Sequence, residues 1–212
     1  QPVATLYSRF NLRGKNYLQK SLVVLQFALA SFLIIGTMVI YSQFNFLTNT
    51  DLGYDDTNIV EISKNIHSHG EAAIFKNELL KSPDIIDVAP KNGGGWRTTA
   101  KIDNDSSIQF NYETVDESYI PMMKIPLLKG RNFSKDYPAD STNSVIVNEA
   151  FVKQAGWKDP IGQSVNFFFN NETCRVIGVV KDYHYNALNE KIGPQLFTMK
   201  NSNNYGIYDI KI

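Results

Sequence analysis

Residues 22–40, LVVLQFALASFLIIGTMVI, form an apolar run of 19 residues without one charged side chain. At about 1.5 Å of rise per residue, a helix of this length spans roughly 28 Å, close to the hydrocarbon thickness of a bilayer. A core helix of a soluble protein is usually shorter and keeps a polar face. A signal peptide has a shorter apolar core and a cleavage site after it. The run therefore predicts a membrane anchor, with a transmembrane helix and stalk over residues 21–48.

The charges on the two sides of this run differ in sign. Residues 1–50 carry four basic and no acidic side chains, whereas residues 51–212 carry 17 basic and 21 acidic ones. Positive residues close to a membrane helix stay on the cytoplasmic side. We therefore expect residues 1–20 to be a basic cytoplasmic lead-in and the rest of the chain to lie outside. Neither half has the concentrated basic surface of a nucleic-acid binder, so we expect no nucleic-acid partner.

Cys174 is the only cysteine, so no disulfide can form within the chain. For a domain outside the cytoplasm, this favours a bacterial cell envelope over a disulfide-stapled animal ectodomain. Three glycosylation sequons begin at Asn104, Asn132 and Asn171, and in a bacterial protein we interpret them as ordinary turns.

The outer part alternates between strand and helix periodicity, which is typical of a mixed α/β domain. A capping box at Ser68 and Glu71 begins one predicted helix, and Asn148 and Gly156 are the expected caps of another. The longest linker is expected at residues 135–143. Helices are predicted over residues 71–81, 118–123 and 149–155, and strands over residues 58–62, 85–89, 98–102, 108–115, 145–147, 164–169, 173–180 and 205–212.

Several short motifs resemble ligand sites but lack the partners that such sites need. The Gly93–Gly95 cluster has no Lys-Ser/Thr pair after it, which favours a flexible turn over a phosphate loop. The pair His67 and His69 has no further metal ligand near it, so a solvated loop is expected. Asp55-Asp56 and Asp103-x-Asp105 lack the matching acidic residue of a calcium loop.

Two further features could carry chemistry. Cys174 lies among alternating apolar residues, so a buried structural thiol is expected rather than a nucleophile. The segment KDYHY at residues 181–185 combines a base, an acid and phenols, but no nucleophile or oxyanion loop accompanies it. We interpret it as the polar exit of a strand. The sequence thus predicts no catalytic, cofactor-binding or metal-binding residues and no cofactor.

Six segments, taken in order, resemble the MacB/FtsX-type ABC transporter permeases. The first resembles the first transmembrane helix of a permease half, the second its junction with the periplasmic core domain, and the others the two parts of that domain. They are LQKSLVVLQFALASFLIIG (18–36), DLGYD (51–55), YIPMMKIPLLKGRNF (119–133), VIVNEAF (145–151), PIGQ (160–163) and VIGVVKD (176–182).

The resemblance implies an α+β fold: a transmembrane helix followed by a two-part, MacB-like periplasmic core. One part would comprise residues 49–130 and 198–212, and the other would be an insertion at residues 131–197. The resemblance also implies no enzyme activity in this chain, because an ABC ATPase subunit or domain would hydrolyse ATP and the helix would transmit its movement outward. The implied partners are that ATPase, a dimer partner or second permease half, the lipid bilayer, and a periplasmic adaptor or lipoprotein.

Two other classes of function stay open at this point. A membrane-anchored extracytoplasmic sensor or ligand-binding domain would share the helix and the α/β unit, and would have a signalling domain before Gln1. A membrane-tethered enzyme would need convergent reactive side chains in one deep pocket. The permease reading expects further membrane helices after Ile212, in the bacterial inner membrane. We expect the chain to be part of a longer protein, because it opens with Gln1 and closes on a strand without a turn after it.

Overall fold

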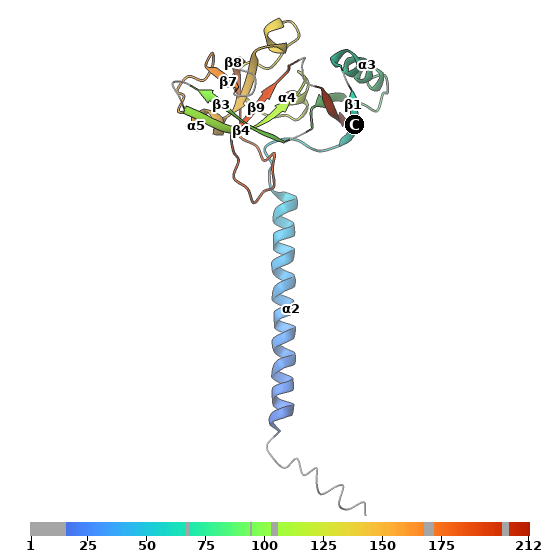
Figure 1. Ribbon diagram of the computed structural model, residues 1–212. Helices are drawn as coiled ribbons and strands as arrows, with labels where there is room; N and C mark the ends of the chain where they lie inside the picture. Colours follow the sequence, from blue (N-terminus) through green and yellow to red (C-terminus); the bar gives the residue numbers. More distant parts are fainter. Residues whose placement is uncertain (1–15, 67, 94, 103–105, 168–171, 201–203) are drawn as a thin grey trace, which may run out of the picture. The chain divides into compact units, whose positions relative to one another are not determined.

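The computed structural model describes residues 16–212 except 67, 94, 103–105, 168–171 and 201–203 (Figure 1). The chain divides into two compact units, residues 1–50 and residues 51–212. The first contains the helix α2, and the second contains all the described strands. We describe each unit by itself.

The helix α2 (Tyr17–Asn49) is unbroken over 33 residues and has no buried side chain. Its apolar side chains are exposed on every face, as the charge-free run predicts. The hydroxyl of Thr37 donates to the Leu33 carbonyl oxygen at 2.8 Å, so this polar group is satisfied within the helix. Within the described ranges, α2 is the one helix long and apolar enough to cross a membrane, with a mean hydropathy of 2.4.

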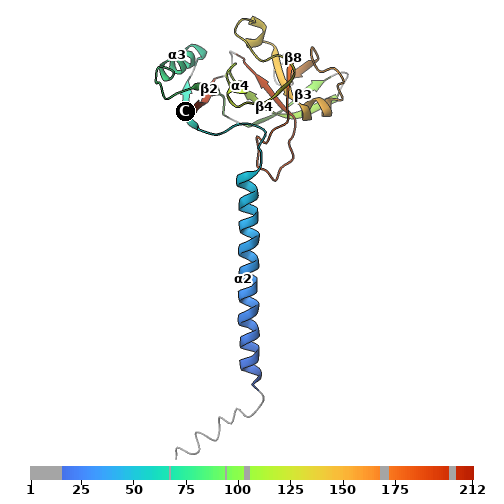
Figure 2. The same ribbon diagram turned by 180° about the vertical axis from the view of Figure 1, so that it is seen from behind.

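A three-stranded antiparallel sheet in the second unit has the order β1-β10-β2. Its strands are β1 (Ile59–Ile66), β10 (Tyr205–Lys211) and β2 (Asp87–Lys91). The helix α3 (His69–Leu79) packs Ala72 and Phe75 against this sheet, and the Phe75 ring lies 5.0 Å from the Tyr208 ring. Both ribbon views show α3 beside this sheet and near the C-terminal residue (Figures 1 and 2).

A seven-stranded sheet has the order β5-β8-β6-β9-β4-β3-β7, and β7 also pairs with β8. This extra pairing joins six of the strands into a closed circuit, whose interior holds an apolar cluster that includes Phe110, Phe151 and Cys174. The strands are β3 (Trp96–Ile102), β4 (Ser106–Thr114), β5 (Leu127–Gly130), β6 (Ser144–Asn148), β7 (Ser164–Phe167), β8 (Thr173–Val180) and β9 (Gln195–Thr198). The short helices are α4 (Tyr119–Met122), α5 (Glu149–Ala155) and the 3-10 helix η1 (Pro138–Ser141).

The predicted helix caps are confirmed. The Ser68 hydroxyl accepts a hydrogen bond from the Glu71 N–H at 3.2 Å, and the Asn148 side chain accepts one from the Phe151 N–H at 3.0 Å. Gly156 ends α5 in the left-handed conformation, with φ +70°. The predicted strands that begin at residues 98 and 108 form the hairpin β3–β4, and those that begin at residues 164 and 173 form the hairpin β7–β8. The mixed α/β fold expected after the helix is therefore confirmed.

The structure adds elements that the sequence pattern does not predict. β5 lies in residues 124–133, for which no strand is predicted, and β9 is a central strand of the larger sheet. The 3-10 helix η1 lies inside the expected linker at residues 135–143. The larger sheet takes strands from both sides of the domain boundary expected at residue 131, so the division into residues 49–130 with 198–212 and residues 131–197 stays a prediction.

Candidate functional site

Residues 51–57, here called the attachment segment, lead from α2 into β1 and are bound into the second unit by main-chain hydrogen bonds. The Leu52 carbonyl oxygen accepts from the His184 N–H at 2.8 Å. The Asp55 N–H donates to the Met123 carbonyl oxygen, also at 2.8 Å. These bonds come from two loops that are far apart in the sequence, so the attachment segment is an integral part of the fold.

Asp55 adds ion pairs to these main-chain bonds. Its carboxylate lies 2.7 Å from the Lys124 ammonium and 3.3 Å from that of Lys211, and it accepts from the Thr57 N–H at 3.0 Å. The hydrogen bonds from Lys124 and Thr57 hold the pKa of Asp55 well below its usual value. Asp55 therefore binds lysines of its own chain.

The KDYHY segment serves as a structural junction. The Asp182 carboxylate accepts from the Ala150 N–H at 2.9 Å, next to the start of α5. Tyr183 is buried and stacks on Phe197, with the ring centroids 6.4 Å apart. The Tyr185 hydroxyl donates to the Gly193 carbonyl oxygen at 3.1 Å. The segment thus links α5, the entry to β9 and the attachment segment.

A cavity of about 520 Å³ lies between the two sheets. It is bounded by β1, β2 and β10 on one side and by β4 and the KDYHY segment on the other. Five tyrosines line it, together with apolar side chains that include Met123 and Ile207: Tyr54, Tyr112, Tyr119, Tyr183 and Tyr185. Burial raises the pKa of Tyr119 and Tyr183 well above the usual value, so both are neutral phenols.

One ion-paired cluster forms part of the cavity wall. The Lys91 ammonium lies 2.8 Å from the Asp209 carboxylate and 3.0 Å from that of Glu61. Burial alone would lower the pKa of Lys91, but the hydrogen bond and charge of Asp209 raise it. Lys91 is therefore charged and already paired.

Glu113 and Gln195 add acceptor atoms to the same cavity. Among the described residues, the Glu113 carboxylate makes no hydrogen bond or ion pair, and burial raises its pKa to about 7. The buried Gln195 side chain has no partner for its Oε1 atom. Sequence reasoning missed both residues. The only local signal for Glu113 was that a charged residue stands within the predicted strand at residues 108–115.

Of the remaining sequence candidates, Asp56, Gly93 and Gly95 also line this cavity, whereas the others lie apart from it or have structural roles. His69 packs on the Tyr205 ring, with centroids 4.4 Å apart, and Cys174 is fully buried, which raises the pKa of its thiol. His67, Gly94, Asp103 and Asp105 lie outside the described residues. In the part of the chain that is described, no three His, Cys, Asp or Glu side chains are grouped as metal ligands require.

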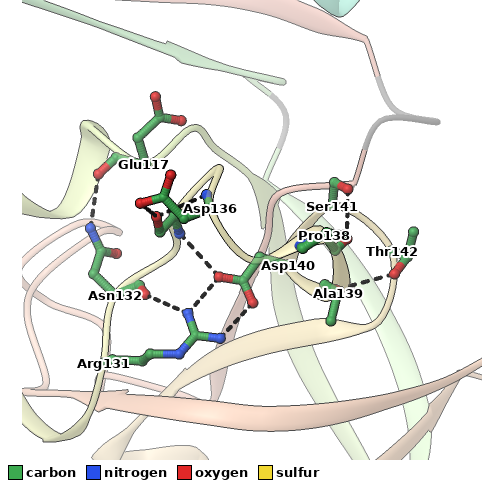
Figure 3. A network of polar contacts seen from close by, with 10 residues as sticks. Glu117, Arg131, Asn132, Asp136, Pro138, Ala139, Asp140, Ser141 and Thr142 are labelled. Carbon is green, nitrogen blue, oxygen red and sulfur yellow. Dashed lines mark hydrogen bonds and ion pairs between the residues drawn. The ribbon is translucent and has the colours of Figure 1, made fainter.

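The Gly-Arg-Asn-Phe stretch at residues 130–133, which begins at the last residue of β5, has a structural role as well. The Arg131 guanidinium forms two hydrogen bonds with the fully buried Asp140 carboxylate, at 2.5 and 2.8 Å (Figure 3). The same carboxylate accepts from the Ser134 N–H at 3.0 Å, and Phe133 is buried in the core. This network fixes the course of the chain between β5 and β6.

Comparison with known proteins identifies the family. The sequence model of the MacB-like periplasmic core domain matches residues 21–200. No curated protein matches the chain.

Two solved structures show the same fold. The periplasmic region of MacB from Actinobacillus actinomycetemcomitans superimposes with a TM-score of 0.56 at 22% identity, covering 76% of each chain. The extracellular domain of the noncanonic ABC-type transporter YknZ from Gram-positive bacteria gives a TM-score of 0.53 at 13% identity, covering 72% of this chain and 81% of that one. The first is the periplasmic region of a longer protein, and the second is one domain of an ABC-type transporter.

Proposed function

Because this chain belongs to the MacB-like periplasmic core domain family, we propose that it forms the outer domain and first membrane helix of one half of an ABC transporter permease. In this proposal α2 crosses the bacterial inner membrane, residues 1–20 lie in the cytoplasm, and residues 51–212 lie in the periplasm. The basic side chains before the helix and the acidic ones after it support this orientation.

The proposed role is mechanical coupling. A separate nucleotide-binding subunit or domain hydrolyses ATP, and α2 carries the resulting movement of the membrane part to the outer domain. The attachment segment is the observation that carries this role. Main-chain bonds to His184 and Met123 and the ion pairs of Asp55 hold it in the second unit, so a displacement of the chain at Thr50 pulls on folded structure rather than on a loose tether.

The helix itself suits this role, because its 33 residues contain no proline and it is continuous through Asn49. The partners that follow from the proposal are the ABC ATPase, a dimer partner or second permease half, and a periplasmic adaptor or lipoprotein. The exposed apolar side chains of α2 would contact lipid and the helices of the other permease half.

The test compares Val39→Pro with Val39→Leu in the complex with its ATPase, reconstituted in liposomes. Proline inside a helix costs about 3 kcal/mol or more and kinks it, whereas leucine keeps the helix. We expect the complex with Val39→Pro to retain ATP hydrolysis by its ATPase but to lose transport, while the circular dichroism and thermal unfolding of the outer domain stay unchanged. Val39→Leu should behave as the native protein.

A second variant tests the attachment segment directly. Six Gly-Ser residues inserted between Thr50 and Asp51 would replace a fixed connection by a flexible one. Transport should then fail with ATP hydrolysis retained. Normal transport in both the insertion and the proline variant would refute mechanical coupling.

A further inference from the structure

We propose that the cavity between the two sheets binds a small organic ammonium ion that carries an apolar group. This goes beyond the permease role and does not depend on it, since it concerns a ligand site within the second unit. The cavity has about 520 Å³, within the range of roughly 300–1,000 Å³ that small-molecule sites occupy.

The cavity leaves two acceptor groups unused, besides the Tyr183 hydroxyl, which is also buried without a partner in the described part of the chain. The Glu113 carboxylate has no hydrogen-bond or ion-pair partner among the described residues, and the Gln195 Oε1 atom is buried without one. A buried acceptor without a donor costs about 1–3 kcal/mol. A ligand with N–H groups would satisfy both positions, whereas an anion could satisfy neither.

The charges of the cavity wall point in the same direction. Four carboxylates line it against one ammonium, that of Lys91. Lys91 is already paired with Asp209 and Glu61, and no ion pair with a described residue uses Asp56 or Glu113. The cavity is therefore left with uncompensated negative charge, which favours a cation.

The aromatic side chains supply the rest of the binding surface. Tyr54 and Tyr183 meet edge to face with ring centroids 5.5 Å apart, and Tyr119 and Tyr185 also line the cavity. Ring faces attract ammonium ions, and each such contact is worth about 0.5–2 kcal/mol. Met123 and Ile207 offer contacts to the apolar part of the ligand.

The protonation of Glu113 gives the binding a characteristic pH dependence. Burial raises its pKa to about 7, and a bound cation would lower that pKa because it favours the carboxylate. Binding would then release a proton, so affinity should rise as pH rises through about 7. The charged and titratable groups that face Glu113 are Lys91 of β2, Asp209 of β10, Glu61 of β1, Tyr119 of α4 and Tyr183 of the KDYHY segment.

The experiment is a calorimetric titration of the full chain in lipid nanodiscs with phenethylammonium, using empty nanodiscs as the reference. The amine stays protonated throughout, so a change in affinity reports on the protein. We expect saturable binding that is about tenfold tighter at about pH 8 than at about pH 6, because roughly one proton must leave Glu113. Phenethyl alcohol, which has the same ring and no charge, should bind much more weakly.

The matched variants are Glu113→Gln and Glu78→Gln. Both remove one negative charge, but Glu78 is on α3, paired with Lys81 and away from the cavity. Glu113→Gln should weaken binding at least tenfold at about pH 8 and abolish its pH dependence, whereas Glu78→Gln should bind as the native chain does.

Three results would overturn the proposal: no saturable binding by the native chain, equal affinity for the alcohol, or unchanged binding by Glu113→Gln. The Val39→Pro result is independent of all three, so a failure of the ligand site and a failure of mechanical coupling are distinguishable.

Discussion

Lys76 on α3 and Asp116, just after β4, form an ion pair of 2.6 Å with both side chains largely withdrawn from solvent. The Lys76 ammonium also donates to the Ser118 hydroxyl at 2.6 Å. Because α3 packs on the three-stranded sheet and β4 lies in the larger one, this pair joins the layers of the second unit. Burial raises the pKa of Asp116 to about 6 even though the ammonium opposes it.

Removing the ammonium should therefore destabilise the second unit. We expect Lys76→Met to lower the free energy of unfolding by about 3 kcal/mol near neutral pH, since a buried carboxylate then lacks its partner. The loss should shrink below about pH 6, where Asp116 takes up a proton. Urea unfolding followed by tryptophan fluorescence measures it. The double variant Lys76→Met with Asp116→Asn should recover most of the loss, and a double variant as unstable as the single one would contradict this account.

Glu113 should make the second unit less stable as pH rises. Its pKa is about 7 in the folded state against an ordinary 4.5, so the folded state binds more protons between these values. The contribution of Glu113 to the free energy of unfolding is complete below about pH 4.5, and it decreases by up to about 3 kcal/mol as pH rises to about 7. The advantage of Glu113→Gln over the native chain should grow across this range. Thermal unfolding at several pH values measures it, and a constant difference would show that Glu113 has an ordinary pKa.

Two glycines with the same backbone conformation should respond differently to alanine. Gly130 and Gly156 have φ +74° and +70°, but a Cβ on Gly130 would lie 2.1 Å from the Ile177 carbonyl oxygen, whereas one on Gly156 meets nothing within 4 Å. Gly156→Ala should cost about 1 kcal/mol, for the left-handed conformation alone. Gly130→Ala should cost clearly more, because β5 must separate from β8. Equal unfolding midpoints for the two variants would rule out the steric explanation.

Arg131 should not be replaceable by lysine. The guanidinium holds both oxygens of Asp140 at once, which a single ammonium cannot do. We expect Arg131→Lys to lower the free energy of unfolding by about 1–2 kcal/mol, and Asp140→Ala by about 3 kcal/mol. Chemical denaturation measures the free energy of unfolding of both variants. Lys129→Arg on the exposed strand β5 is the control for exchanging one basic residue for another.

Transport should not depend on the His184 ring or the Cys174 thiol. His184 holds the attachment segment through its main-chain N–H, which alanine retains, and Cys174 is a buried side chain in the apolar cluster. His184→Ala and Cys174→Ala should change transport less than about twofold, with a stability loss of about 1 kcal/mol for the cysteine variant. If either variant folded well but had no activity, the hypothesis that this chain is an enzyme would have to be considered again. That conclusion would be strongest if the Val39→Pro variant still supported normal transport.

Local patterns were sufficient for much of the fold. The charge-free run predicts α2, and the Asn148 and Gly156 caps delimit α5, because both signals depend on neighbouring residues. β9 was missed because its four residues, Gln195–Thr198, are too few to show a period, and pairing with β4 and β6 decides their conformation. β5 was missed because Pro126 precedes it and its side chains are exposed.

The cavity could not be predicted for the same reason. Glu113 and Gln195 come from different strands, and only the parallel pairing of β4 with β9 brings those strands together. A single sequence shows which residues carry acceptors, but it does not show which acceptors are left without donors after folding.

The position of β10 has a consequence for biosynthesis. This strand is the last in the unit, yet it lies between β1 and β2, which have no direct pairing with each other. During synthesis, the sheet of β1 and β2 therefore cannot assemble until residues 205–211 have emerged from the ribosome. Until then their strand edges and the apolar face of α3 stay open to wrong partners, so this period is when the growing chain most needs a chaperone.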